Sequence, residues 1–305
     1  MLLSAIRKHP FDGTEAIRGR SLWQDARTRF SRNKAAMVSA YVLLFVALLA
    51  LFGPLLSAWS NQDIDWGVLG NVREMGAPAF ANGHYFGTDE LGRDLFARVI
   101  QGSQISLMVG FVGAMISVIV GTVYGATAAY FGGRIDGAMM RLVDILLSIP
   151  YMFVLILLLV IVGQSIFMLF IGIGMISWLD MSRIVRGQTL SIRQKDYVEA
   201  ASAIGVSHSA IIFRHIIPNL LGVVIVYATL LIPDMILAES FMSFLGLGVQ
   251  EPNTSWGALI SSGAAQMQYG TLWIIGFPLF FFAITLFSLY FVGDGLRDAL
   301  DPKDR

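Results

Sequence analysis

The sequence predicts an all-α polytopic membrane protein with six transmembrane helices and both termini in the cytoplasm. Hydrophobic residues make up 56% of the 305 residues and charged residues 14%, whereas soluble proteins average about 45–50% and about 25%. A core of this size cannot bury so much apolar surface, so lipid must solvate much of it. Several apolar runs also approach the roughly 20 residues that a helix needs to cross the hydrocarbon core.

The first predicted span covers residues 35–57 and carries no charge. The second covers residues 105–130, where Gly121-x-x-x-Gly125 would let a neighbouring helix approach closely. A membrane helix that merely tolerates glycine is the alternative. The fifth runs from about Ile216 toward Leu247, and the sixth covers residues 272–292.

Two further spans lie in residues 142–179, where Asp144 is the one charged group. A single helix of this length would extend roughly 57 Å, against a hydrocarbon core of about 30 Å. The chain must therefore turn back. We expect the turn at Gly163-Gln164-Ser165, which is polar and flexible, with the third span before it and the fourth after it.

The orientation follows from the lysine and arginine residues. An inside N-terminus places 18 of the 21 in the cytoplasm, in the tail before Ala35, the 131–141 turn, the 183–214 loop and the C-terminal tail. Such a bias sets the orientation of membrane proteins. Three remain outside: Arg73, Arg93 and Arg98.

These spans divide the chain into a cytoplasmic tail (1–34), the first helix (35–57), an extracytoplasmic segment (58–100), a core of five helices (101–293) and a cytoplasmic C-terminal tail (294–305). In the first tail, an apolar stripe faces arginines and predicts a helix lying flat on the membrane, capped by Ser21. A solvated tail that orders only in a complex is the alternative. The stripe consists of Leu22, Trp23, Ala26 and Phe30, with Arg20, Arg27 and Arg29 opposite.

The cytoplasmic segment 183–214 predicts two short helices that protrude as a knob. Asp196 is placed to cap the first helix, and Glu199 to complete a capping box. Gly205 supplies a left-handed residue that ends it, and Ser207 caps the second. The segment also fits an ordinary connection or a DNA-binding helix-turn-helix, but a DNA reader needs freedom to dock in a groove, and spans fix both ends here.

Other patterns exclude several kinds of chemistry. The chain has no cysteine, which excludes disulfides and thiolate metal sites, and its four histidines lack a metal-ligand spacing. The dipeptide Gly-Lys does not occur, so the phosphate-binding loop of ATPases is absent. We therefore expect a protein that is not an enzyme and that binds no cofactor, metal or nucleic acid itself.

Charged residues inside the spans suggest two roles. Arg141 and Asp144 are expected to pair on one helix face. Asp234 and Glu239 follow Pro233 and are candidates for bordering a translocation path, because an acid at mid-membrane costs about 2.5–3.5 kcal/mol unless it faces water or a partner. For Glu239, a position near the outer headgroups is the alternative.

Two other classes of membrane protein use acidic residues in or near their spans. A proton-coupled secondary transporter could use Asp234 and Glu239 as a relay, but it has no motor to contact the knob. An intramembrane aspartyl protease could use Asp294, but Phe291 occupies the first glycine position of its Gly-x-Gly-Asp motif.

From about Ser21 to its end, the chain resembles the type I permeases of bacterial ABC importers, and most closely the C-type inner-membrane subunits of the oligopeptide and dipeptide permeases. The usual aliphatic residue of the coupling motif is replaced by His215, which is also usual in the peptide branch. The motifs that carry the resemblance are Gly87-Thr88-Asp89-Glu90-Leu91-Gly92-Arg93-Asp94, Glu199-Ala200-Ala201 with Gly205 and Pro218, Phe244-Leu245-Gly246-Leu247-Gly248, Ser255-Trp256-Gly257, and Gly293-Asp294-Gly295-Leu296-Arg297-Asp298-Ala299-Leu300-Asp301-Pro302.

The resemblance implies the type I importer permease fold in the bacterial cytoplasmic membrane, with residues 101–293 as the permease core. It implies a second homologous permease subunit, two ATP-binding cassette ATPases that bind ATP and magnesium, and an extracytoplasmic peptide-binding protein. Glu199, Ala200, Ala201 and Gly205 would contact one ATPase. The cargo would be an oligopeptide, although dipeptide, glutathione and nickel importers share most of these motifs.

The topology can be tested with single cysteines, since the chain has no native cysteine to give background labelling. An impermeant thiol reagent added outside intact cells should label cysteines at Asn82 and Asn253, and should not label those at Gln194 and Asp304. The cysteine-free protein is the control. Outside labelling at Gln194 would contradict the predicted orientation.

Overall fold

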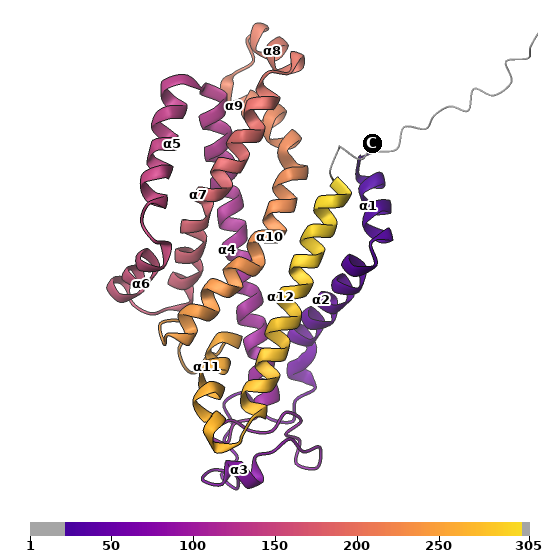
Figure 1. The fold of residues 1–305 in the computed structure, drawn as a ribbon, viewed down its shortest axis with the longest axis vertical. Helices are drawn as coiled ribbons and strands as arrows, with labels where there is room; N and C mark the ends of the chain where they lie inside the picture. The colour runs from indigo at the N-terminus through magenta and orange to yellow at the C-terminus, as the bar shows by residue number, and fades with distance from the viewer. Residues whose placement is uncertain (1–21, 301–305) are drawn as a thin grey trace, which may run out of the picture.

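The computed structural model describes residues 22–300, which form helices joined by loops (Figure 1). Within these residues, β-type pairing is limited to three isolated bridges in the segment before α4. The elements are α1 Leu22–Arg32, α2 Lys34–Phe52, η1 Gly53–Leu55, α3 Val72–Met75, α4 Leu95–Phe131, α5 Gly133–Leu147, α6 Tyr151–Val162, α7 Ile166–Arg193, α8 Asp196–Ala203, α9 His208–Ile211, η2 Ile212–Ile216, α10 Ile217–Phe244, α11 Trp256–Gln266, η3 Met267–Tyr269 and α12 Trp273–Leu300.

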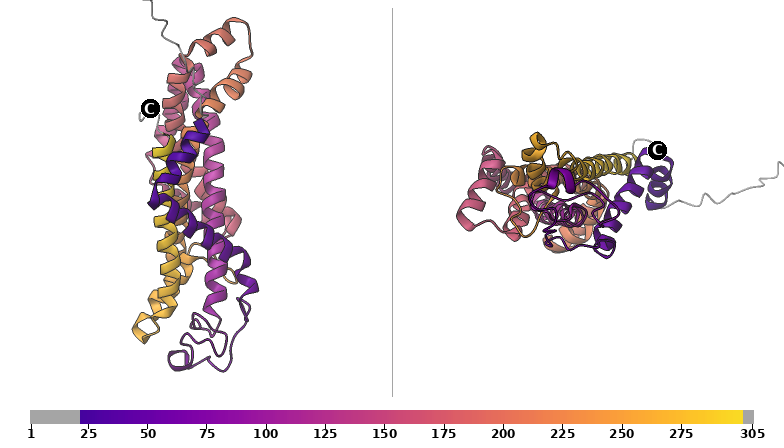
Figure 2. Two further views of the ribbon diagram at one scale, coloured as in Figure 1. Left: turned by 90° about the vertical axis from the view of Figure 1, so that its right-hand side faces the viewer. Right: turned by 90° about the horizontal axis from the view of Figure 1, so that it is seen from below.

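The long helices form an elongated bundle whose two ends differ (Figures 1 and 2). The short helices α8 and α9 protrude at one end, and the segment with α3 lies at the other. The start of α1 and the end of α12 lie in the same half as α8 and α9. The cytoplasmic segments proposed from the basic residues therefore gather toward one end, although their side of a membrane stays a prediction.

The all-helical membrane fold is confirmed. Five helices in the described chain are long and apolar enough to cross a membrane, and a sixth span results if the bent pair α5 and α6 is counted as one. Most are longer than predicted: α4 begins ten residues before Ile105, α7 continues to Arg193, and α12 continues to Leu300. The loop predicted at 183–214 is thus helical at its start, and α4 takes the last residues of the segment predicted at 58–100.

The predicted third span is not a continuous helix. α5 and α6 meet at Ser148-Ile149-Pro150 and are bent by 77°. Pro150 lacks an amide hydrogen and disfavours a helical conformation at Ile149, so the helix ends there. The predicted turn at residues 163–165 does separate α6 from α7.

α4 is the central helix, and its glycines set its distance from α7. A methyl group on Gly121 would lie 2.8 Å from the Trp178 carbonyl oxygen, and one on Gly125 would lie 2.3 Å from the Ser182 carbonyl oxygen. The two backbones therefore touch, as the small-residue spacing predicts. α4 contributes to the hydrophobic clusters that also contain α6, α7, α10 and α12.

Helix α1 packs against α12 through its described part. Ala26 is buried, and a methyl group on Gly295 would meet Phe30 and Ala36. The predicted cap Ser21 and Arg20 lie outside the described residues. The position of this helix at a membrane surface stays a prediction.

Candidate functional site

The protruding knob consists of α8, the turn after it and α9. It exposes three of the predicted coupling residues and buries the fourth. Glu199 and Ala200 are exposed on α8, and Gly205 is exposed at the tip. Ala201 is buried, with 6% of its surface exposed, among side chains from α4, α7 and α10. The first two are therefore free to contact another chain, while Ala201 anchors α8.

The predicted capping box at the start of α8 is wrong. Lys195 is the N-cap residue, Asp196 is already the first helical residue, and no side chain caps the helix. The shift of one residue removes the geometry that a capping box needs, so Glu199 is left exposed without a capping role.

The turn of the knob is as predicted. Gly205 has φ +82°, a left-handed conformation that side chains with a Cβ rarely adopt. The Ser207 hydroxyl accepts a hydrogen bond from the Ala210 amide at 3.4 Å and caps α9. The angle between the two short helices is therefore held by one glycine and one serine.

The base of the knob is fixed to the bundle. The Tyr130 hydroxyl at the end of α4 lies 2.7 Å from Nδ1 of His208, the first residue of α9. Val198 and Ile211 are buried in the cluster beneath. α9 then continues through the π-helical turn η2 into α10. The knob is therefore joined to α10 by a continuous helical segment.

Asp234 lines a pocket of about 490 Å³ between the α5–α6 break, α7 and α10. Its carboxylate accepts a hydrogen bond from the Tyr290 hydroxyl of α12 at 2.9 Å. Asp180 of α7 lines the same pocket; sequence reasoning gave it no role, because nothing local places it beside Asp234.

Glu239 lies in a different environment from Asp234 and has no exposed surface. Ser243 donates to its Oε1 at 2.6 Å, and Ser106 and Ser240 donate to its Oε2 at 3.3 Å each. Ser106 belongs to α4, so the carboxyl group joins α4 to α10. Glu239 borders no open path in this conformation and instead holds the helices together.

The same polar cluster explains the Ser255-Trp256-Gly257 motif. Ser255 caps α11 and donates to the Ser243 hydroxyl at 3.2 Å. Trp256 is fully buried, and its indole donates to Ser103 at 3.1 Å. A methyl group on Gly257 would lie 2.4 Å from the Ser240 Cα. The motif packs α11 onto α10 and α4.

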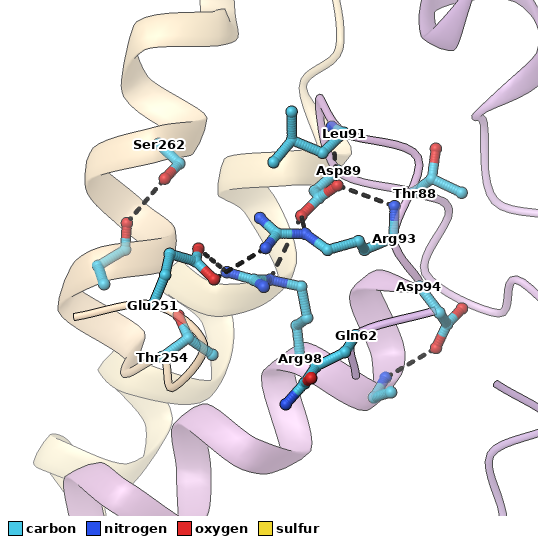
Figure 3. A network of polar contacts seen from close by, with 12 residues as sticks. Gln62, Thr88, Asp89, Leu91, Arg93, Asp94, Arg98, Glu251, Thr254 and Ser262 are labelled. Carbon is cyan, nitrogen blue, oxygen red and sulfur yellow. Dashed lines mark hydrogen bonds and ion pairs between the residues drawn. The ribbon is translucent and has the colours of Figure 1, made fainter. Parts of the chain in front are cut away.

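At the opposite end of the bundle, the Gly87–Asp94 motif forms a network of charges. The Arg93 and Arg98 side chains converge on Glu251 (Figure 3), with N–O distances of 2.8 and 2.9 Å. Asp89 pairs with both arginines, at 2.7 and 3.3 Å. Although burial acts to raise it, hydrogen bonds from Arg98 and Arg93 hold the pKa of Glu251 below its ordinary value.

Asp94 caps α4 and fixes the loop before it. Its Oδ2 accepts from the Ala97 amide at 2.8 Å, and its Oδ1 lies 2.9 Å from Nδ1 of His84. His84 is fully buried, stacks on Trp59 and lies 3.3 Å from Asp65 through Nε2. Burial raises the pKa of Asp94. This motif therefore builds the N-terminal end of α4.

Two ion pairs join α5 to α7, and they correct one prediction. Asp144 pairs with Arg183 instead of Arg141, and Asp136 accepts two hydrogen bonds from Arg186 at 2.6 Å. Spacing along the sequence does not show which residue of a neighbouring helix a charged side chain will pair with. Within residues 22–300, no group of three His, Asp or Glu side chains could hold a metal ion.

Comparison with known proteins assigns the family. Residues 117–305 match the binding-protein-dependent transport system inner membrane component family, and residues 21–71 match the N-terminal transmembrane domain of oligopeptide transport permease C. The chain belongs to the family of binding-protein-dependent transport inner membrane components. These are permease subunits of ABC transporters, so the prediction of a non-catalytic permease subunit is confirmed.

Similar curated proteins place the chain in the peptide branch of that family. It is 57% identical to the oligopeptide transport system permease protein OppC of Salmonella typhimurium over 95% of this chain and 94% of that protein. It is 54% identical to OppC of Haemophilus influenzae, over 95% of this chain and 91% of that one. The dipeptide transport system permease protein DppC of Bacillus subtilis is 43% identical, over 93% of this chain and 87% of that one.

The structure also resembles a solved importer. The methionine ABC transporter MetNI, in an inward-facing conformation, has a chain that superposes with a TM-score of 0.52 and 18% identity, covering 66% of this chain and 95% of that chain. This likeness supports the type I importer permease fold.

The charge network around Glu251 predicts a pH-dependent loop. The ordinary pKa of Glu251 is 4.5 and its folded value is lower, so its ion pairs are intact above 4.5 and are lost as the pH falls through the folded value. At neutral pH, Glu251→Gln should speed amide hydrogen exchange in residues 88–94 by about two- to fivefold, as for a solvent-exposed ion pair.

The difference between wild type and Glu251→Gln should disappear in acid. The control is Glu74→Gln, since Glu74 is in no ion pair in the described chain and bonds to Asn71. Equal exchange of wild type and Glu251→Gln at neutral pH would show that the network does not hold this loop.

Proposed function

We propose that this chain is the C-type permease subunit of an ATP-driven importer that moves oligopeptides across the bacterial cytoplasmic membrane. The observation that carries the proposal is the similarity of nearly the whole chain to oligopeptide permeases. The protein would be a multi-pass membrane protein with both termini and the knob in the cytoplasm. The distribution of basic residues supports this orientation.

The proposed complex contains a second homologous permease, two ATPases and an extracytoplasmic peptide-binding protein. The chain carries no phosphate-binding loop, which supports ATP and magnesium binding on separate subunits. The exposed knob supports mechanical contact with one of them. Glu199 and Ala200 would touch the ATPase, while Ala201 and Gly205 would hold the shape of the contact.

The proposed path runs past the pocket that contains Asp234. The side chain is exposed at a level of the bundle where an acid must face water or a partner. Glu239 would not touch cargo in this conformation, because serines surround it. Dipeptide import is the second candidate, favoured by the similarity to DppC of Bacillus subtilis.

The first experiment reconstitutes the five-part complex in proteoliposomes. A labelled tripeptide to pentapeptide should accumulate with ATP and should not accumulate without it or with a proton gradient alone. Dipeptides, glutathione and nickel are compared in the same assay. Accumulation without ATP, or of nickel only, would contradict the assignment.

The second experiment tests the knob. Gly205→Val places a β-branched residue at φ +82°, where strain costs about 1–3 kcal/mol, so the variant should insert in the membrane but lose peptide uptake and bind ATPase weakly. Gly205→Asn is the matched control, because asparagine tolerates this conformation. Glu199→Lys, which inverts an exposed charge, should behave like the valine variant. Full uptake by both would show that the knob is only a connector.

A further inference from the structure

The pocket beside Asp234 has the size and lining of a ligand site. Its volume of about 490 Å³ falls within the roughly 300–1,000 Å³ of small-molecule sites. Most of its wall is apolar or aromatic, with Pro150, Tyr151 and Leu237 among the lining residues. Its two charged groups are the carboxylates of Asp180 and Asp234, and no lining residue is basic.

Neither carboxylate is neutralised by the described chain. Asp180 and Asp234 are both exposed and form no ion pair within residues 22–300. Arg183, the nearest basic residue along α7, is already paired with Asp144 of α5. The Tyr290 hydroxyl donates a hydrogen bond to Asp234, which orients that carboxylate.

We propose that Asp180 and Asp234 form a binding station for the protonated amino groups of the peptide cargo. The station would take the side-chain ammonium group of a lysine residue, while the apolar wall accepts the neighbouring side chain. This inference rests on the proposed function. Two carboxylates that line one pocket attract a cation together, because each adds a favourable Coulomb interaction with it.

The position of the two carboxylates also connects the station to the knob. Asp180 lies on α7, and Asp234 lies on α10, which is continuous with α9 through η2. The segment His208–Phe244 is one long helical unit. The helix α7 also leads into the knob, through α8. A displacement that moved α10 against α7 would change the position of Asp234 relative to Asp180 and release a bound ammonium group.

The test uses the reconstituted complex and binding protein preloaded with one of two tripeptides that differ only in lysine or norleucine at the last position. When the loaded binding protein is present at a saturating concentration, the initial uptake rate measures the permease step. The ratio of lysine-peptide to norleucine-peptide uptake should fall by about fivefold in the Asp180→Asn, Asp234→Asn double variant, as for the loss of a solvent-accessible ion pair.

The matched control is Asp294→Asn, which removes an exposed carboxylate of α12 outside the pocket and should leave the ratio unchanged. If the double variant does not assemble, each single variant should lower the ratio. An unchanged ratio in the variants, with uptake of both peptides by wild type intact, would overturn the station. No ATP-driven uptake of either peptide by wild type would instead overturn the proposed function.

Discussion

The backbone contact between α4 and α7 is the constraint on which the rest of the structure depends. At Gly121 and Gly125 the two helices meet so closely that even a methyl group would overlap a carbonyl oxygen. Helices in lipid gain little from the hydrophobic effect and associate mainly by close packing and hydrogen bonds. This contact therefore fixes the bundle axis, and the other helices are placed relative to it.

The two ends of α4 have different physical properties. The N-terminal end is tied by Asp94, by buried His84 and by two arginines that share Glu251. Such a network resists displacement, because moving one member breaks several charge-assisted hydrogen bonds at once. The C-terminal end touches the knob mainly through Tyr130 and His208 and through apolar contacts. The asymmetry suits a protein that is held at one end and moved at the other.

The two acidic residues of α10, Asp234 and Glu239, have different surroundings. Glu239 is satisfied by three serine hydroxyls and joins α4 to α10, with Ser243 linking it to Ser255 at the start of α11. Asp234, little more than one turn away, faces a pocket shared with α7. The two residues look alike in sequence, since both are acids in one apolar run after Pro233. Their different neighbours bury Glu239 between helices and leave Asp234 at a pocket.

The sequence by itself determined the helical membrane fold, the turn at Gly205 and the family, because each depends on local composition or on motifs along the chain. The tertiary structure alone decided the break at Pro150, the ion pair between Asp144 and Arg183, and the presence of Asp180 and Asp234 in one pocket. It also moved the cap of α8 to Lys195 and buried Glu239. Each of these depends on which face of one helix meets another, and periodicity within a uniformly apolar helix does not specify that face.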